Sequence, residues 1–327
     1  NTTGASNVAV GFEALNANST GTRNIAIGQN AYNSSDTEND NIAIGLDAMT
    51  TNTAGGTKNV AVGNYALDAL TSGDNNIAIG HDALTANTTA SSNTAIGREA
   101  MKTTTTGDSN VAIGSQALLD NTTGAANVAI GTSALENNTT AANNTAVGTF
   151  ALITNTTGAS NTAVGKDALA ANTTADNNTA VGYAALTANT TGDRNTAMGR
   201  DALLSNTTSD ANTAVGYEAL KTVSTTEQST AIGFQALRAN TAANNTAVGS
   251  GAMYTNTTGA NNVAVGMEAL RLNTTGTRNI AIGVQAMDGS DTENDNIAIG
   301  YQAMTTDNAG GTANVALGNY TLDALTS

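Results

Sequence analysis

The sequence predicts an all-β fold, a parallel β-solenoid of about nineteen coils with a 17-residue period. A phrase of the form Asn-x-Ala-(Ile/Val)-Gly recurs nineteen times between Gly11 and Gly318. The closing glycines are 17 residues apart, except for two steps of 18 and one of 16. Within each phrase the side chains alternate as in a strand, yet both faces are apolar. A period this short and regular is typical of stacked coils that each contact only their neighbours.

The alternation within the phrase predicts which residues face the coil interior. In residues 24–28, Ala26 lies on one face, and Ile25 and Ile27 lie on the other. Apolar residues on both faces indicate burial on both faces. The small Ala suits the narrow interior, and a thin coil leaves the branched pair without a partner of its own. A neighbouring chain is the simplest partner, so these positions predict an oligomer interface. The interface residues are Val8, Val10, Ile25, Ile27, Ile42, Ile44, Ile77, Ile79, Val263, Val265, Ile280 and Ile282.

Two variable residues follow each glycine, and an Ala and a large apolar residue come next, as at Ala14 and Leu15. This uniform pair predicts an internal ladder on a second short strand. A single helical turn is the alternative, because the same residue types favour helix. The position directly after the glycine varies freely, from Phe12 to His81 to Lys166, which indicates an exposed site.

Each coil closes with a turn of the type Asn-Thr-Thr-Gly, as at residues 121–124. Asn and Gly tolerate the left-handed backbone of a tight corner. A second corner is expected at the glycine that ends the phrase. The same turns create formal N-glycosylation triplets, for which turn chemistry is the favoured interpretation. These triplets begin at Asn87, Asn121, Asn155, Asn189 and Asn256, among others.

The composition excludes some classes of partner. There are 26 acidic residues against 11 basic ones, for a formal charge of −15. Nucleic acids and anionic membranes bind proteins through clustered Lys and Arg, so neither is expected as a partner. No apolar stretch is long enough to span a membrane, so this segment is not expected to insert into one. The absence of Cys rules out disulfides.

The sequence also contains a longer repeat, which spans many of the short ones. Residues 20–72 and 275–327 are near-identical copies that lie 255 residues, or fifteen coils, apart. This duplication predicts that residues 1–327 are one continuous solenoid segment of a longer chain.

The recurring phrase, with its small-residue coils, resembles the head repeats of trimeric autotransporter adhesins of the YadA type and similar repeats of phage tail fibres. The resemblance covers the whole chain. It implies a left-handed parallel β-roll in which three chains pack around a common axis through their Ile/Val faces. It also implies an extracellular location, on a cell or virion surface, and a glycan or protein of a host surface as partner. The family repeats are commonly shorter than 17 residues. The first axial position also changes to Thr in seven consecutive coils, from Thr145 to Thr246, which predicts a wetter or more loosely packed axis there.

No catalytic or cofactor-binding residues are expected. His81 is the only histidine, and triads or His-based zinc sites need more than one such group. Alternating acidic side chains in two corners suggest calcium, since Ca²⁺ is bound by carboxylate oxygens. A solvated acidic corner is the competing interpretation. The residues are Asp36, Glu38 and Asp40, and their copies Asp291, Glu293 and Asp295.

These features favour a structural and adhesive fibre that presents many weak sites and gains avidity from their number. A purely architectural filament or sheath without a receptor is the first alternative. An ice-binding Thr-rich solenoid is the second, although its adjacent threonines lie in corners. A glycan-cleaving enzyme would need paired carboxylates at a cleft, whereas the carboxylates here are scattered.

Overall fold

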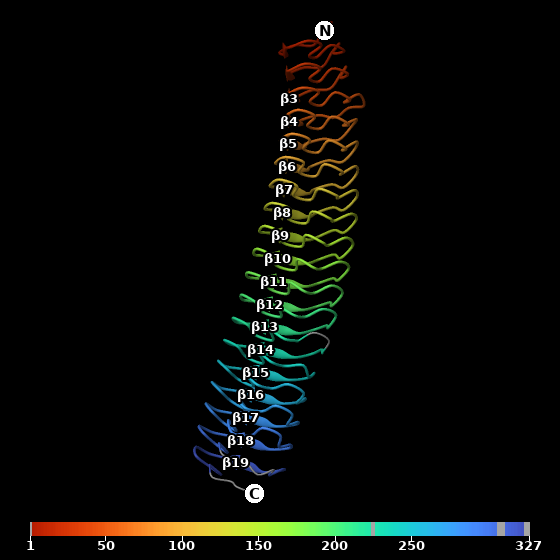
Figure 1. The fold of residues 1–327 in the computed structure, drawn as a ribbon. Helices are drawn as coiled ribbons and strands as arrows, with labels where there is room; N and C mark the ends of the chain where they lie inside the picture. Colours follow the sequence, from red (N-terminus) through yellow and green to blue (C-terminus); the bar gives the residue numbers. More distant parts are fainter. Residues whose placement is uncertain (1, 224–225, 306–310, 324–327) are drawn as a thin grey trace. The chain divides into compact units, whose positions relative to one another are not determined.

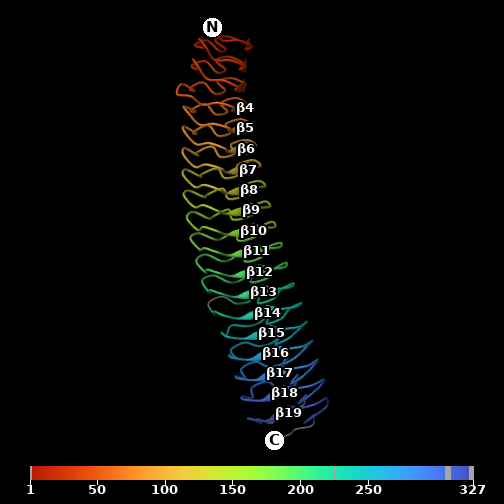
Figure 2. The same cartoon turned by 180° about the vertical axis from the view of Figure 1, so that it is seen from behind.

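The computed structural model describes residues 2–223, 226–305 and 311–323. The chain divides into two compact units, Asn1–Asn161 and Thr162–Ser327. In each unit, short strands lie one above another in chain order (Figures 1 and 2). Neighbouring strands pair in parallel and in register, so that Ile25 lies beside Ile42 and Thr162 beside Thr179. The predicted all-β parallel solenoid with a 17-residue period is confirmed.

Among the described residues, the strands are three residues long and begin directly after the Asn of the phrase, or after Ser229 in the one coil that lacks this Asn. Unit 1 contains β1 (Val8–Val10), β2 (Ile25–Ile27), β3 (Ile42–Ile44), β4 (Val60–Val62), β5 (Ile77–Ile79), β6 (Thr94–Ile96), β7 (Val111–Ile113), β8 (Val128–Ile130) and β9 (Thr145–Val147). Unit 2 contains β10 (Thr162–Val164), β11 (Thr179–Val181), β12 (Thr196–Met198), β13 (Thr213–Val215), β14 (Thr230–Ile232), β15 (Thr246–Val248), β16 (Val263–Val265), β17 (Ile280–Ile282), β18 (Ile297–Ile299) and β19 (Val315–Leu317).

The interior of each coil is built from the small and apolar residues that the sequence placed there. The central strand residue is fully buried, as at Ala26 and Ala163. The Ala and Leu positions after the glycine are also fully buried, as at Ala66 and Leu67. The predicted internal ladder is therefore confirmed.

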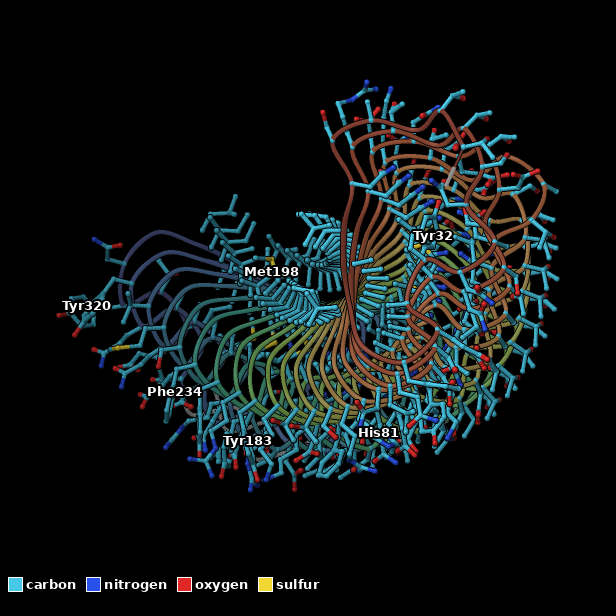
Figure 3. All side chains as sticks on the ribbon, turned by 90° about the horizontal axis from the view of Figure 1, so that it is seen from above. Tyr32, His81, Tyr183, Met198, Phe234 and Tyr320 are labelled. Atoms are coloured by element: carbon cyan, nitrogen blue, oxygen red, sulfur yellow. The ribbon has the colours of Figure 1, made fainter. Side chains whose placement is uncertain are left out.

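Tyr32 replaces Leu in one coil and is also fully buried (Figure 3). Its hydroxyl accepts hydrogen bonds from the side-chain amides of Asn41, at 2.5 Å, and Asn52, at 3.2 Å. Burial raises the pKa of the Tyr32 phenol well above its usual value. The coil thus accommodates a larger side chain where polar partners satisfy its hydroxyl.

The prediction of a second strand through the Ala-Leu pair is wrong, and the described residues form no helical turn there either. The segment is a run of turns in which Glu13 and Leu15 have φ values of 54° and 55°. This left-handed backbone is rare for residues other than Gly and interrupts an extended strand. Hydrogen bonds between coils stabilise it. The amide of Leu15 donates to the carbonyl of Ala31 at 3.0 Å, and the amide of Asn30 donates to that of Phe12 at 2.9 Å.

The corner expected at the end of the phrase is confirmed. Gly28 has a φ of +138°, a conformation that side chains disfavour. A Cβ atom at Gly28 would lie 2.3 Å from the carbonyl oxygen of Gly45 in the next coil. The glycine is therefore needed for both the backbone conformation and the close approach of coils.

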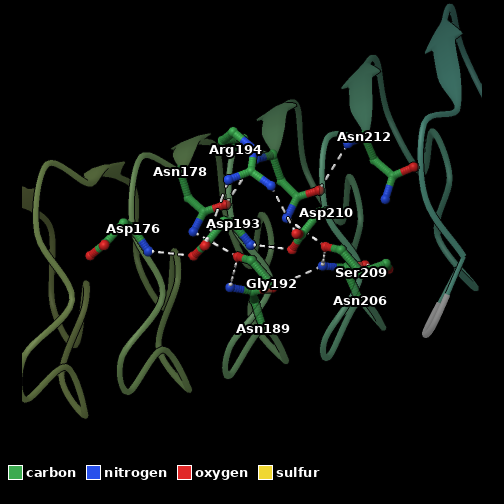
Figure 4. Close-up of polar contacts among 11 residues, drawn as sticks. Asp176, Asn178, Asn189, Gly192, Asp193, Arg194, Asn206, Ser209, Asp210 and Asn212 are labelled. Carbon is green, nitrogen blue, oxygen red and sulfur yellow. Dashed lines mark hydrogen bonds and ion pairs between the residues drawn. The ribbon is translucent and has the colours of Figure 1, made fainter.

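Two columns of buried Asn side chains join the coils (Figure 4). Before the strand, Asn195 donates to the carbonyl of Ser209 at 2.8 Å and accepts from the amide of Asn212 at 3.0 Å. In the corner, Asn189 donates to Gly192 at 2.9 Å and accepts from Asn206 at 2.8 Å. The corner column includes the glycosylation triplets named above, and their Asn residues are fully buried. This supports turn chemistry as their role in the folded chain.

Candidate functional site

The outer face of the sheet in unit 1 carries a mostly apolar stripe, defined as the first and third residues of each strand. Only Thr94 in β6 and Thr145 in β9 interrupt its aliphatic residues. Val10 is 57% exposed and Ile79 is 39% exposed, and Val8, Ile27 and Ile77 are exposed to a similar degree. The other predicted interface residues of this unit, Ile25, Ile42 and Ile44, are half-buried. Strand pairing places each of them directly beside its equivalent in the next coil.

The same face of unit 2 carries a mixed stripe. From β10 to β15 its first residue is Thr, and its third is apolar, as at Val164 and the exposed Met198. From β16 onward both positions are aliphatic again. Val263, Val265 and Ile280 are half-buried there, and Ile282 is exposed.

All twelve predicted interface residues thus lie on the outer sheet face of their own unit, in stacked registers. A continuous exposed apolar patch marks an interaction surface in soluble proteins. The stripe can therefore bury against another apolar surface. That this surface belongs to sister chains stays a prediction.

In the acidic corner of unit 1, the carboxylates of Asp36, Glu38 and Asp40 each bind different partners. Glu38 is buried and accepts hydrogen bonds from the Ser35 hydroxyl at 2.7 Å and from the amide of Gly55 at 3.1 Å. Asp40 forms two bonds with the Arg23 guanidinium, at 2.5 and 2.8 Å. The hydrogen bond from Arg23 lowers the pKa of the Asp40 carboxyl. Asp36 accepts from the Ser19 hydroxyl.

The copy in unit 2 repeats these contacts. Asp295 bonds to Arg278 at 2.6 and 2.8 Å, and Asp291 accepts from the Thr274 hydroxyl. Glu293 accepts from Ser290 at 3.0 Å. Burial alone would raise the pKa of Glu293, but donors from the backbone and from Ser290 lower it overall. Across the described part of the chain, no group of three or more acidic, His or Cys side chains is arranged to hold a metal ion. The geometry gives the predicted calcium sites no support.

The position directly after the phrase glycine is exposed in most coils, as expected, and half-buried in the others, as at Leu46 and Val284. Its residues stack into what we call the outer ladder. His81 lies there, 5.8 Å from the Tyr65 ring in an edge-on contact. In unit 2 the ladder is richer in aromatic and basic residues. The Tyr183 ring lies between Lys166, at 5.8 Å, and Arg200, at 5.4 Å.

Further along the outer ladder, Tyr217 stacks on Phe234 with ring centroids 5.4 Å apart. Beside Phe234 is a surface hollow of about 230 Å³ whose lining includes Ser250, Gly251 and Met267. The aromatic residues alone did not reveal this hollow in the sequence. A usable signal was present, because Gly251 is the only glycine among the nineteen residues that lie two positions after a phrase glycine.

The first threonine of a corner pair is engaged within the stack. The hydroxyl of Thr122 donates to the carbonyl of Thr139 at 3.0 Å, and that of Thr190 donates to Thr207 at the same distance. These hydroxyls are committed to neighbouring coils and are poorly placed to order ice. The ice-binding alternative stays a hypothesis.

Comparisons with known proteins identify no family for this chain. A scan of the chain against protein-family models finds no match, and a search among curated proteins also finds none. Within the described residues, no helix has the length and apolarity that a membrane span requires.

Proposed function

We propose that this chain is a segment of an extracellular structural and adhesive fibre on a cell or virion surface. In this proposal three copies wind as left-handed β-rolls and pack side by side through their apolar stripes. The supporting observation is the stripe itself. It consists of aliphatic side chains such as Val10 and Ile79, which are exposed on an otherwise regular sheet face in stacked registers.

The physical argument follows from repetition. Burying apolar surface contributes about 25 cal/mol per Å². Every coil presents the same two positions, so every added coil extends the same contact with a sister chain. A long stripe therefore gains association energy in proportion to its number of coils, which suits a fibre better than a small globular assembly.

The adhesive part of the proposal rests on the outer surface. Residues of the outer ladder vary from coil to coil, while the interior stays constant. Three parallel chains would present each surface feature three times. Weak sites repeated in this way bind with an avidity that exceeds the affinity of one site.

Light scattering under native conditions tests the assembly. One chain has a mass of 32.4 kDa, so three chains have a mass of about 97 kDa. We expect the larger value and its loss in the variant Ile42→Asp, which places a charge on the stripe. The matched control is Gln29→Asp, which adds the same charge on the outer ladder. A folded wild-type chain that remains at 32.4 kDa would rule out the three-chain fibre.

A further inference from the structure

We propose that the hollow beside Phe234 binds a neutral saccharide, with one sugar ring packed against the Phe234 face. The inference deepens the proposed function, on which it rests for its biological use, by naming the ligand class that the fibre would recognise. The hollow is formed by three consecutive coils of unit 2 and has a volume of about 230 Å³.

The aromatic wall of the hollow is open on one side only. Tyr217, one coil earlier in the outer ladder, covers one face of Phe234 with its ring, at an interplanar angle of 13°. The next residue of the ladder is Ser250, which is too small to cover the other face. Phe234 is consequently 52% exposed. An exposed aromatic face that is held in place by a second ring offers a flat apolar platform.

The floor of the hollow results from a missing side chain. At the position of Gly251, the coils before and after it carry Gln235 and Glu268. A Cβ built on Gly251 would meet only the Cγ of Glu268 within 4 Å, at 3.6 Å, so space is present where other coils place a side chain. Met267, 48% exposed, closes the far end.

Polar groups around the hollow are held in place by neighbouring coils. The Glu268 carboxylate accepts from Gln285 at 2.9 Å, and the Arg271 guanidinium donates to Asp288 at 2.9 Å. The Tyr254 ring lies below the Arg238 guanidinium at 5.8 Å. Carboxylate, guanidinium and hydroxyl groups around an aromatic face match the alternating hydroxyls and apolar C–H face of a pyranose.

The charges of this rim favour a neutral ligand over an acidic one. Glu268 and Arg271 are both in the lining and have opposite charges. Arg271 is already paired with Asp288, so no unpaired cation of the lining is directed at an anionic sugar. The formal charge of −15 over the chain also disfavours acidic glycans.

The position of the hollow is compatible with the proposed fibre. Seen along the stack, Phe234 and Tyr183 lie on the outer rim of unit 2, whereas Met198 of the stripe lies on the other side of the ribbon (Figure 3). Packing of sister chains against the stripe would therefore leave the hollow open.

Saturation-transfer NMR and titration calorimetry on the whole 327-residue chain test the site. The probes are neutral oligosaccharides of glucose, galactose, mannose and their N-acetylated amines, with sialylated versions for comparison. We expect one or more neutral probes to bind. Phe234→Ala removes the platform, and Gly251→Gln fills the floor. Each should weaken binding about tenfold or more.

Both variants are expected to fold. Phe234 is exposed, and Gln235 shows that Gln adopts this backbone, with a φ of 55° against 66° for Gly251. The matched controls are Tyr183→Ala, at the same coil position as Phe234, and Ser133→Gln, at the same coil position as Gly251. Both controls should retain wild-type affinity.

The outcomes separate the two proposals. Absence of binding to every neutral probe, binding of sialylated probes alone, or equal affinity in Phe234→Ala and wild type would overturn the saccharide site. A three-chain mass with no saccharide binding refutes this inference and leaves the fibre standing. A single-chain mass, with binding that Gly251→Gln abolishes, refutes the three-chain fibre and leaves the saccharide site standing.

Discussion

Strands β2–β5 of unit 1 and strands β10–β15 of unit 2 have the same kind of interior residues but differ on the outer face. In both regions the central Ala is fully buried, as at Ala43 and Ala180. The first stripe residue is Ile or Val in β2–β5 and Thr in β10–β15. Paired strands keep the same register in both regions. A coil therefore folds equally well with either residue at this position.

The difference shows that packing between coils constrains the interior residues but not the first residue of the stripe. Where the next coil approaches closely, the Ala and Gly positions hardly vary, and the Leu position accepts only Leu, Met or, once, Tyr32. Val and Thr have nearly the same shape but differ by a hydroxyl, which needs a hydrogen-bond partner when buried. The stripe of β2–β5 is suited to dry packing, whereas that of β10–β15 is suited to a surface that retains water.

The largest effect is expected from a charge on the dry part of the stripe. Ile42→Asp should abolish the three-chain assembly, because an unpaired carboxylate in an apolar contact costs several kcal/mol. Thr179→Asp, at the same strand position in the wetter region, should reduce association less. Light scattering across a concentration series measures both. Equal effects of the two variants would remove the distinction between dry and wet stripes.

Truncation of the interior should affect both regions alike. Leu67→Ala and Leu203→Ala each leave a cavity at a fully buried site, and each should destabilise its coil by about 2–5 kcal/mol. Hydrogen exchange of amides in the adjacent coils measures this local loss. Leu272→Ala, at an exposed corner, is the control and should change exchange little. A much smaller effect for Leu203→Ala would show that the interiors are not equivalent.

Apolar substitution should make the wet region resemble the dry one. The triple variant Thr179→Val, Thr196→Val and Thr213→Val should stabilise the assembly by about 1 kcal/mol for each substitution, if the chains bury this face. Thermal melting of the assembled form measures the gain. Unchanged melting would mean that the stripe of β10–β15 does not contact another chain.

The smallest expected effect is a change in stability at acidic pH. It concerns two similar ionic clusters, one in each unit. Glu218 accepts from Lys221, Arg238 and Gln235 at 2.6 to 2.8 Å, and these bonds lower its pKa from 4.5 to about 2. Glu99 occupies the same coil position, and its hydrogen bond with Lys102 also lowers its pKa. The side chain of Glu218 is more buried, at 8% exposed against 20%.

Because the pKa of Glu218 is lower in the folded state, its ionised form stabilises unit 2 above pH 4.5, and this contribution is lost as pH falls toward about 2. Glu218→Gln should flatten the acid-melting profile over that range. Glu99→Gln should change it less, since exposed ion pairs contribute little. Circular dichroism melts from neutral to acidic pH compare the two variants. A larger change for Glu99→Gln would contradict this ranking.

The candidate site could be predicted from the sequence only in part. The stripe followed from two-residue alternation, so residues such as Ile25 and Ile27 were placed correctly on one face. The sequence did not predict the hollow, because the hollow depends on contacts among Phe234, Gly251 and Met267, which belong to three different coils. The acidic corners are a second case. Alternating carboxylates suggested calcium, and that suggestion stays a prediction. The sequence did not reveal that Arg23, one coil earlier, pairs with Asp40.

The sequence by itself determined the period, the parallel stacking and the choice of interior residues. These depend on local alternation and on glycines that permit close approach, and both are written in every repeat. Only the tertiary structure decided the backbone after each glycine. Leu15 and its equivalents adopt left-handed conformations that local preferences disfavour, because hydrogen bonds from the adjacent coils offset the cost. Contacts between coils also decided which exposed residues form a hollow, since no single repeat contains it.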